Sequence, residues 1–153
     1  MTSTTRVGGL IVGTFAAVGV GLAVVTWAAG SWGQVLFLSG AGGETTRFGP
    51  VFLALVAFQT TVSSLLLGPA LGALLGTLAG SRFARLGRAA VVSGAGALVG
   101  TVVMGLPVAV LATTTGGPQA YPLGAAVAPI GVAAVAAGAV GAAGGAVGSA
   151  LVR

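Results

Sequence analysis

Four long apolar windows, with charged residues only between or outside them, constrain the fold of this chain more than any other feature. A membrane-spanning helix needs about 20 mostly apolar residues, and each window is long enough to supply one. The expected fold is all-α, a compact bundle of four transmembrane helices in a single domain that covers residues 1–153. We predict spans at about residues 7–29, 50–80, 89–112 and 124–152.

The composition excludes a surface that faces water. The 153-residue chain is 56% hydrophobic and 5% charged, whereas soluble domains carry roughly 25% charged residues. Too few polar side chains are present to cover a soluble domain. The bias toward Ala, Gly, Val, Thr and Arg, without Lys or Asn, is typical of a GC-rich prokaryote.

Side chains that transfer protons or bind metals are almost absent. The sequence contains no Lys, Asp, His or Cys, and Glu44 is its only carboxylate side chain. General acid–base catalysis and metal binding both require such groups, and the Ser and Thr hydroxyls have no base to activate them. We therefore expect that the protein is not an enzyme, with no catalytic, cofactor-binding or metal-binding residues and no cofactor.

The arginines predict how the chain is oriented. Cytoplasmic flanks of membrane helices carry excess Lys and Arg. With four spans, Arg6, Arg153 and the three arginines of residues 82–88 lie on one side, and Arg47 lies alone on the other. This predicts a multi-pass protein of the cell membrane with both termini in the cytoplasm. A cleaved leader is the alternative for the first window, although its apolar run of about 23 residues exceeds the usual 7–15.

Two outer loops are expected, at residues 31–49 and 113–124. The first contains a short apolar run, residues 35–38, that rests on the lipid headgroups or, alternatively, dips into the membrane. Aromatic rings favour the membrane–water interface, and four of them are predicted to lie near the outer one: Trp27, Trp32, Phe48 and Tyr121.

The second window carries a glycine at every fourth position: Gly68, Gly72, Gly76 and Gly80. Each costs about 1 kcal/mol relative to alanine inside a helix, so a compensating contact is expected. Membrane helices associate through close backbone contact at small residues four apart. We predict a helix-packing face that resembles a glycine zipper, which is a packing motif and not a family. Because the row drifts about 40° per step, the second helix should touch at least two others.

Three weaker rows carry less weight, because Gly and Ala are so abundant that such rows arise by chance. They are Gly9, Gly13, Ala17 and Gly21 in the first window, Ser93, Ala97, Thr101 and Gly105 in the third, and Ala133, Ala137, Gly141, Gly145 and Ser149 in the fourth. Three prolines inside the windows predict static kinks, with hinges as the alternative: Pro69, Pro107 and Pro129.

Two groups of polar side chains are the candidate functional residues. One lies in the outer half of the second window: Gln59, Thr60, Thr61, Ser63 and Ser64. It either lines a polar pathway or forms hydrogen bonds between helices. The other is Arg82, Arg85 and Arg88, whose spacing of three allows one helix face and contact with anionic lipid headgroups. Topology alone also accounts for these arginines.

These features favour a non-enzymatic structural or accessory subunit of a membrane complex, packed through glycine-rich helix faces. The alternative is a small channel or facilitator for an ion or uncharged solute, lined by residues 59–64. Expected partners are the lipid bilayer and either a membrane protein or further copies of the chain. Nucleic acid is not expected, because no basic patch is interleaved with aromatic residues.

Overall fold

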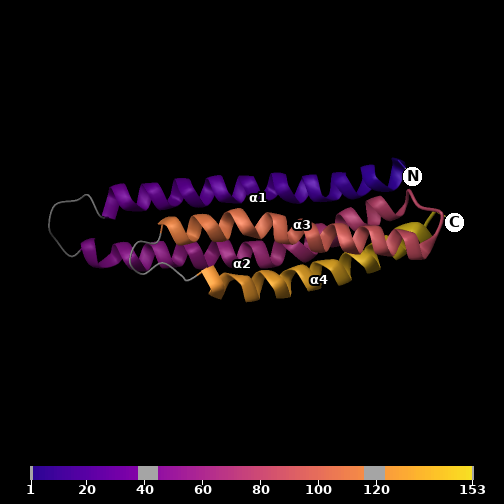
Figure 1. Ribbon diagram of the computed structural model, residues 1–153. Helices are drawn as coiled ribbons and strands as arrows, with labels where there is room; N and C mark the ends of the chain where they lie inside the picture. Colours follow the sequence, from indigo (N-terminus) through magenta and orange to yellow (C-terminus); the bar gives the residue numbers. More distant parts are fainter. Residues whose placement is uncertain (1, 38–44, 116–122, 153) are drawn as a thin grey trace.

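Four long helices make up the described chain (Figure 1). They are α1 (Thr2–Phe37), α2 (Thr45–Gly80), α3 (Leu86–Thr115) and α4 (Leu123–Ala150). The computed structural model describes residues 2–37, 45–115 and 123–152. Within the helices, some side chains fall outside this description: 2–3, 33–34, 36–37, 45–50, 52–54, 56–57, 60–61, 64, 112–115 and 123–126. The prediction of an all-α, four-helix fold is confirmed for the described residues.

Three of the helices are long and apolar enough to cross a membrane. Their candidate spans are Thr4–Trp32 in α1, Leu86–Leu111 in α3 and Val127–Ala150 in α4. Helix α2 contributes a shorter apolar stretch, Leu65–Gly80, among its described residues. The chain is therefore a multi-pass helical membrane protein, and a fourth crossing by α2 stays a prediction.

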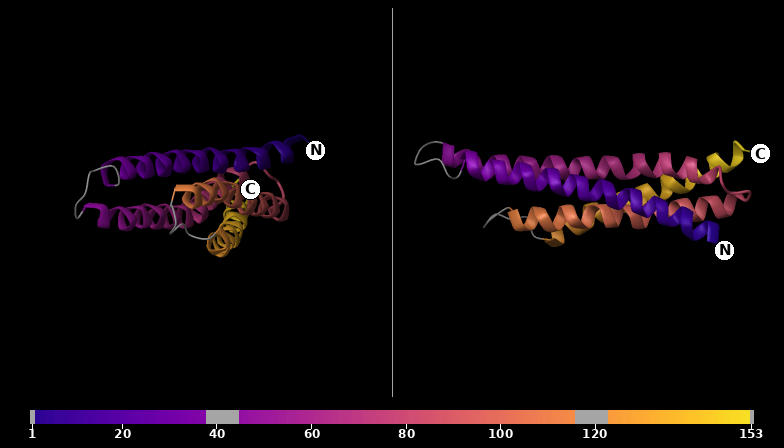
Figure 2. Two further views of the ribbon diagram at one scale, coloured as in Figure 1. Left: turned by 60° about the vertical axis from the view of Figure 1, so that its left-hand side comes forward. Right: turned by 90° about the horizontal axis from the view of Figure 1, so that it is seen from above.

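Successive helices run in opposite directions along the bundle, so that α2 and α4 are parallel to each other (Figures 1 and 2). The turn between α2 and α3 lies at the end where α1 begins and α4 finishes. Backbone hydrogen bonds close this turn: the Arg82 amide donates to the Ala79 carbonyl at 3.1 Å, and the Phe83 amide donates to the Gly80 carbonyl at 3.0 Å. The start of α1, the end of α4 and the arginine-rich turn therefore share one end of the bundle.

The predicted outer loop at residues 31–49 is wrong at both flanks, because α1 continues to Phe37 and α2 begins at Thr45. The end of an apolar window limits a membrane span, but backbone hydrogen bonding continues the helix beyond it. At 36 residues each, α1 and α2 are about 54 Å long, well beyond the roughly 30 Å hydrocarbon core. Residue 38 of the predicted apolar run lies outside the described residues.

The middle of the bundle is formed by α2 and α3, each of which contacts the other three helices. Helix α1 lies along one side of this pair and α4 along the other (Figure 1). The prediction that the second helix touches at least two others is confirmed. The three prolines lie within helices, Pro69 in α2, Pro107 in α3 and Pro129 in α4.

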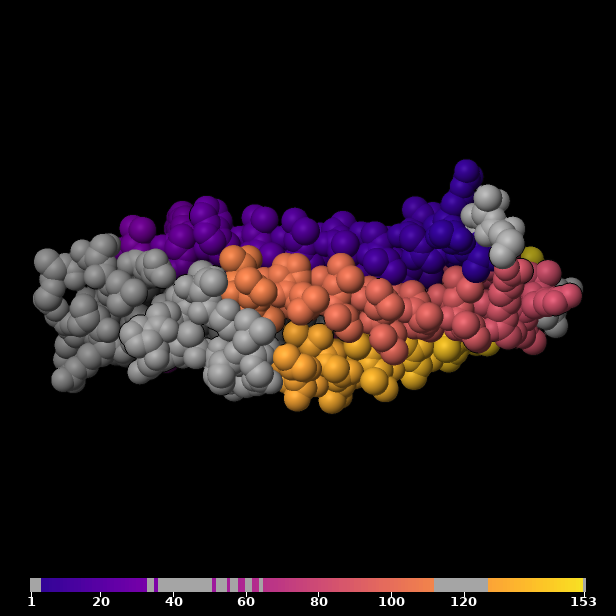
Figure 3. Space-filling view, viewed as in Figure 1, coloured from indigo at the N-terminus to yellow at the C-terminus, as the bar shows by residue number. Residues whose placement is uncertain are grey.

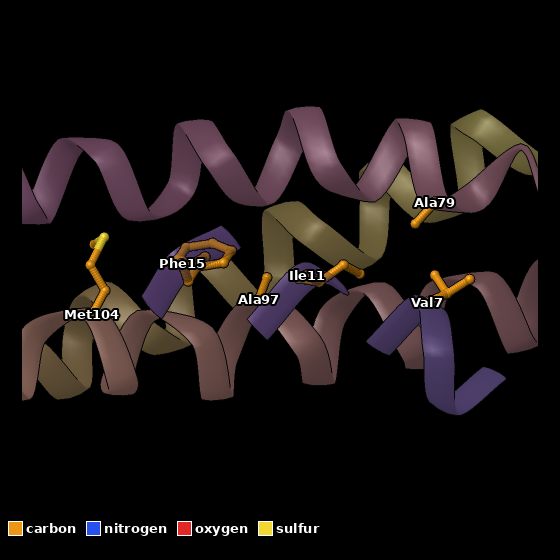
Figure 4. Close-up of a cluster of buried hydrophobic side chains, with 7 residues drawn as sticks. Val7, Ile11, Phe15, Ala79, Ala97 and Met104 are labelled. Carbon is orange, nitrogen blue, oxygen red and sulfur yellow. The ribbon is translucent and has the colours of Figure 1, made fainter. Parts of the chain in front are cut away.

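One cluster of buried apolar side chains draws on all four helices (Figure 4). Its largest members, Phe15 of α1 and Met104 of α3, are 0% exposed. The inner face of α1 repeats at four-residue spacing through Val7, Ile11 and Phe15. The remaining members are all alanines: Ala79, Ala97 and Ala137. Bulky side chains of α1 thus pack together with Met104 of α3 and with alanines of the other three helices.

Candidate functional site

The α2 row (Gly68, Gly72, Gly76 and Gly80) is buried along its whole length. A Cβ atom added at Gly76 would lie 2.5 Å from the carbonyl oxygen of Gly141 in α4. One added at Gly80 would overlap the carbonyl oxygen of Gly145. These obstacles are backbone atoms, which cannot rotate aside as a flexible side chain can. At these positions the α2 and α4 backbones lie so close that only glycine fits.

The α2 row passes from one neighbour to another as it winds around its helix. At Gly68 an added Cβ would lie 3.1 Å from the Cγ2 atom of Thr101 in α3. At Gly72 it would meet both neighbours, 2.8 Å from the carbonyl oxygen of Ala137 in α4 and 3.4 Å from the Cβ of Ala97 in α3. The drift of a four-residue row around a 3.6-residue helix produces this change of partner.

Glycines of α4 also lie close to the α2 backbone. A Cβ at Gly144 would lie 2.8 Å from the carbonyl oxygen of Ala73, and one at Gly148 would overlap the carbonyl oxygen of Thr77. The α2–α4 interface therefore has glycine on both sides. Close approach of this kind is how helices bind one another in lipid, where burial of apolar surface gives little advantage.

The α3 and α4 rows, which carried less weight in the sequence, are also buried. Ser93 of α3 lies where three helices meet: its hydroxyl donates to the carbonyl oxygen of Gly76 at 3.5 Å, and a Cβ at Gly145 would lie 2.8 Å from its Oγ. Other buried hydroxyls bond within their own helix, as Thr101 does to the Ala97 carbonyl at 2.8 Å. These polar side chains support packing between α2, α3 and α4.

The α1 row (Gly9, Gly13, Ala17 and Gly21) has the opposite surroundings, because all its members are exposed. A Cβ added at Gly9, Gly13 or Gly21 would meet no atom of the described residues within 4 Å. Together with Arg6, Leu10 and Thr14, most of this row lines a shallow groove on the outer side of α1. Figure 3 shows α1 along the edge of the bundle. Within the described residues, the α1 row is thus uncovered.

Of the polar group at residues 59–64, the structure describes the side chains of Gln59 and Ser63, and neither is buried. Gln59 is exposed on α2, beside Phe58, which is 70% exposed, and Ser63 is half-buried. The side chains of Thr60, Thr61 and Ser64 lie outside the described residues. Two grooves on the described surface, one on α1 and one between α3 and α4, are lined by other residues.

The three arginines near the α2–α3 turn are all exposed. Arg82 and Arg85 lie in the turn itself, and Arg88 lies in the first turn of α3. The structure adds a fourth, because exposed Arg6 is carried by the start of α1 at the same end of the bundle (Figure 1). The sequence assigned Arg6 to this side of the membrane but did not group it with the turn.

Comparison with protein-family models, with curated proteins and with solved structures finds no match for this chain. Its function is therefore argued from the packing and charge of its own residues.

Proposed function

We propose that this protein is a non-enzymatic structural or accessory subunit of a membrane complex. In this proposal four helices cross the cell membrane, both termini lie in the cytoplasm, and a helix of a partner membrane protein docks on the α1 row. The α2 row acts as a glycine zipper that holds α4 and stabilises the subunit itself.

The observation that carries the proposal is the open space over the α1 row. Each glycine inside a helix costs about 1 kcal/mol relative to alanine. In the α2 row close contact with α4 offsets this cost, whereas Gly9, Gly13 and Gly21 meet no other part of the chain among the described residues. The α2 row contacts a helix that has small residues of its own. A helix of the same kind would fit the α1 row. A partner helix on α1 would supply the missing contact.

A pull-down from native membranes in mild detergent tests this role. The wild-type chain should bring down a larger membrane protein in fixed stoichiometry. Gly9→Leu/Gly13→Leu should lose that partner while the variant stays folded, because the added side chains point into open space. Gly131→Leu is the matched control, since Gly131 is an exposed glycine of α4 with nothing within 4 Å, and it should retain the partner.

Three outcomes would contradict the subunit role. The partner could persist in Gly9→Leu/Gly13→Leu, the wild-type chain could purify as an inert monomer, or the only captured species could be further copies of the same chain. The last result would make the α1 row a contact between copies.

A channel is the second candidate function, and one observation indicates where its pathway would lie. Because Gln59 is exposed on the outside of α2, a polar pathway lined by residues 59–64 would form between copies of the chain. Flux of a small ion or uncharged solute through liposomes that contain only this protein would support it, provided that Gln59→Leu abolishes the flux. Absence of flux through the wild-type protein would dismiss it.

A further inference from the structure

Four exposed arginines, here called the arginine surface, gather at the end of the bundle that holds the α2–α3 turn: Arg6, Arg82, Arg85 and Arg88. Arg6 and Arg82 each adjoin, in the sequence, an apolar residue that packs into the bundle. Val7 and Phe83 pack into the same hydrophobic cluster, so the positions next to them, Arg6 and Arg82, are fixed at the same end. The arginine surface therefore joins α1 to the turn and does not depend on one flexible segment.

Nothing acidic offsets this charge among the described residues of that end. The only carboxylate side chain in the sequence, Glu44, adjoins Thr45, which begins α2 at the opposite end of a 36-residue helix. The first turn of α3 contains no acidic residue, and Gly87 leaves the space beside that turn open. The partial positive charge of the helix N-terminus adds to that of Arg85 and Arg88. An anion from outside the chain would be stabilised here.

The depth of the arginine surface identifies the anion. The candidate spans start at Thr4 in α1 and at Leu86 in α3, so Arg6 and Arg85 lie within two residues of where the apolar segments begin. This is the level of the lipid headgroups. Arginine also matches the geometry of phosphate, because its planar fork donates two hydrogen bonds in parallel.

We infer that the arginine surface binds the phosphate group of an anionic phospholipid. The proposal is independent of the partner on α1, because its ligand lies at the end of the bundle and its test leaves the α1 row unchanged.

Lipid binding to the purified full-length protein, measured by native mass spectrometry, tests the inference. Dioleoyl phosphatidylglycerol should bind more tightly than dioleoyl phosphatidylcholine, which has the same chains without net charge. Arg82→Gln/Arg85→Gln should weaken binding of phosphatidylglycerol about 25-fold, given a contribution of about 1 kcal/mol per arginine near the membrane surface. Arg47→Gln is the matched control, because residue 47 lies in the first turn of α2 at the other end, and it should bind as the wild type does.

Three results would overturn the inference. The protein could bind the two lipids equally, Arg47→Gln could weaken binding as much as the double variant, or inorganic phosphate at the same concentration could compete fully with phosphatidylglycerol. The last result would identify a site for a free anion in place of a lipid.

Discussion

The α1 and α2 rows have the same four-residue spacing and nearly the same composition, yet one is open and the other is filled. In α2 the glycines face inward, and large side chains such as Leu66, Leu74 and Leu78 are 69%, 61% and 67% exposed. In α1 the arrangement is inverted for the row, because Val7, Ile11 and Phe15 face inward and the row glycines face outward, although Gly19, which lies outside the row, is buried against the Met104 backbone. Helix α2 therefore packs through the face that carries its glycine row, whereas α1 packs through the face opposite its row.

The comparison shows what a lipid surrounding permits. Lipid tails solvate a leucine about as well as a protein interior does, so the outward leucines of α2 cost little. Its glycines then bring the α4 backbone close. Helix α1 instead fills most of its interface with Val7, Ile11 and Phe15, and the glycines of its outward row contact none of the described residues. The four-residue spacing of small residues therefore indicates that close contact between helix backbones is possible. It does not indicate which helix makes that contact.

The largest effect is expected from Gly72→Leu/Gly76→Leu. Overpacking costs about 1–3 kcal/mol per site in a well-packed core, and here the obstacles are backbone carbonyls of α4. The double variant should lose several kcal/mol of stability, seen as a fall of many degrees in Tm when helix unfolding is followed by circular dichroism in mild detergent.

Gly9→Leu/Gly13→Leu is the matched control, with the same chemistry on the open row. Its Tm should equal or exceed that of the wild type, because leucine has a higher helix propensity than glycine. Equal losses in the two double variants would remove the distinction between the rows.

A smaller effect is expected from Phe15→Ala. This variant tests whether α1 packs against the other helices through the face that carries Phe15. Truncation of a buried phenylalanine costs about 3–5 kcal/mol, and we expect about 3 kcal/mol because lipid tails already solvate apolar groups. Leu10→Ala on the same helix is the control, since Leu10 is 63% exposed. Chemical unfolding in mixed micelles measures both. A loss for Leu10→Ala as large as that for Phe15→Ala would show that the assigned face is wrong.

Much of the fold could be predicted from the sequence, because hydropathy and helix length are local properties. Each apolar window corresponds to one helix, although the helix bounds differ from the window bounds, and the drift of the α2 row implied at least two neighbours for that helix. The burial of the other rows could not be predicted. Ser93, Gly13 and Gly141 all belong to rows of small residues, yet Ser93 and Gly141 are buried and Gly13 is exposed. Only the placement of whole helices decides this difference.

The candidate residues were less predictable than the fold. Side-chain chemistry singled out Gln59, but its outward direction depends on how α2 is rotated within the bundle. Arg6 could be assigned to a side of the membrane from the sequence, whereas its place at the same end of the bundle as Arg82 depends on how α1 packs against α3. The length of α1 beyond residue 30 was also missed, because polar and glycine residues mark the end of a span but not the end of a helix.

The central claim is that the α2 row is closed by a neighbouring backbone and the α1 row is open. The most direct test adds one methyl group to each row, as Gly76→Ala and Gly13→Ala, and compares the two Tm values in the same detergent. We predict opposite signs: Gly13→Ala should raise stability by up to about 1 kcal/mol through helix propensity, whereas Gly76→Ala should lower it because the methyl group meets the carbonyl oxygen of Gly141. A Gly76→Ala protein at least as stable as the wild type would contradict the account.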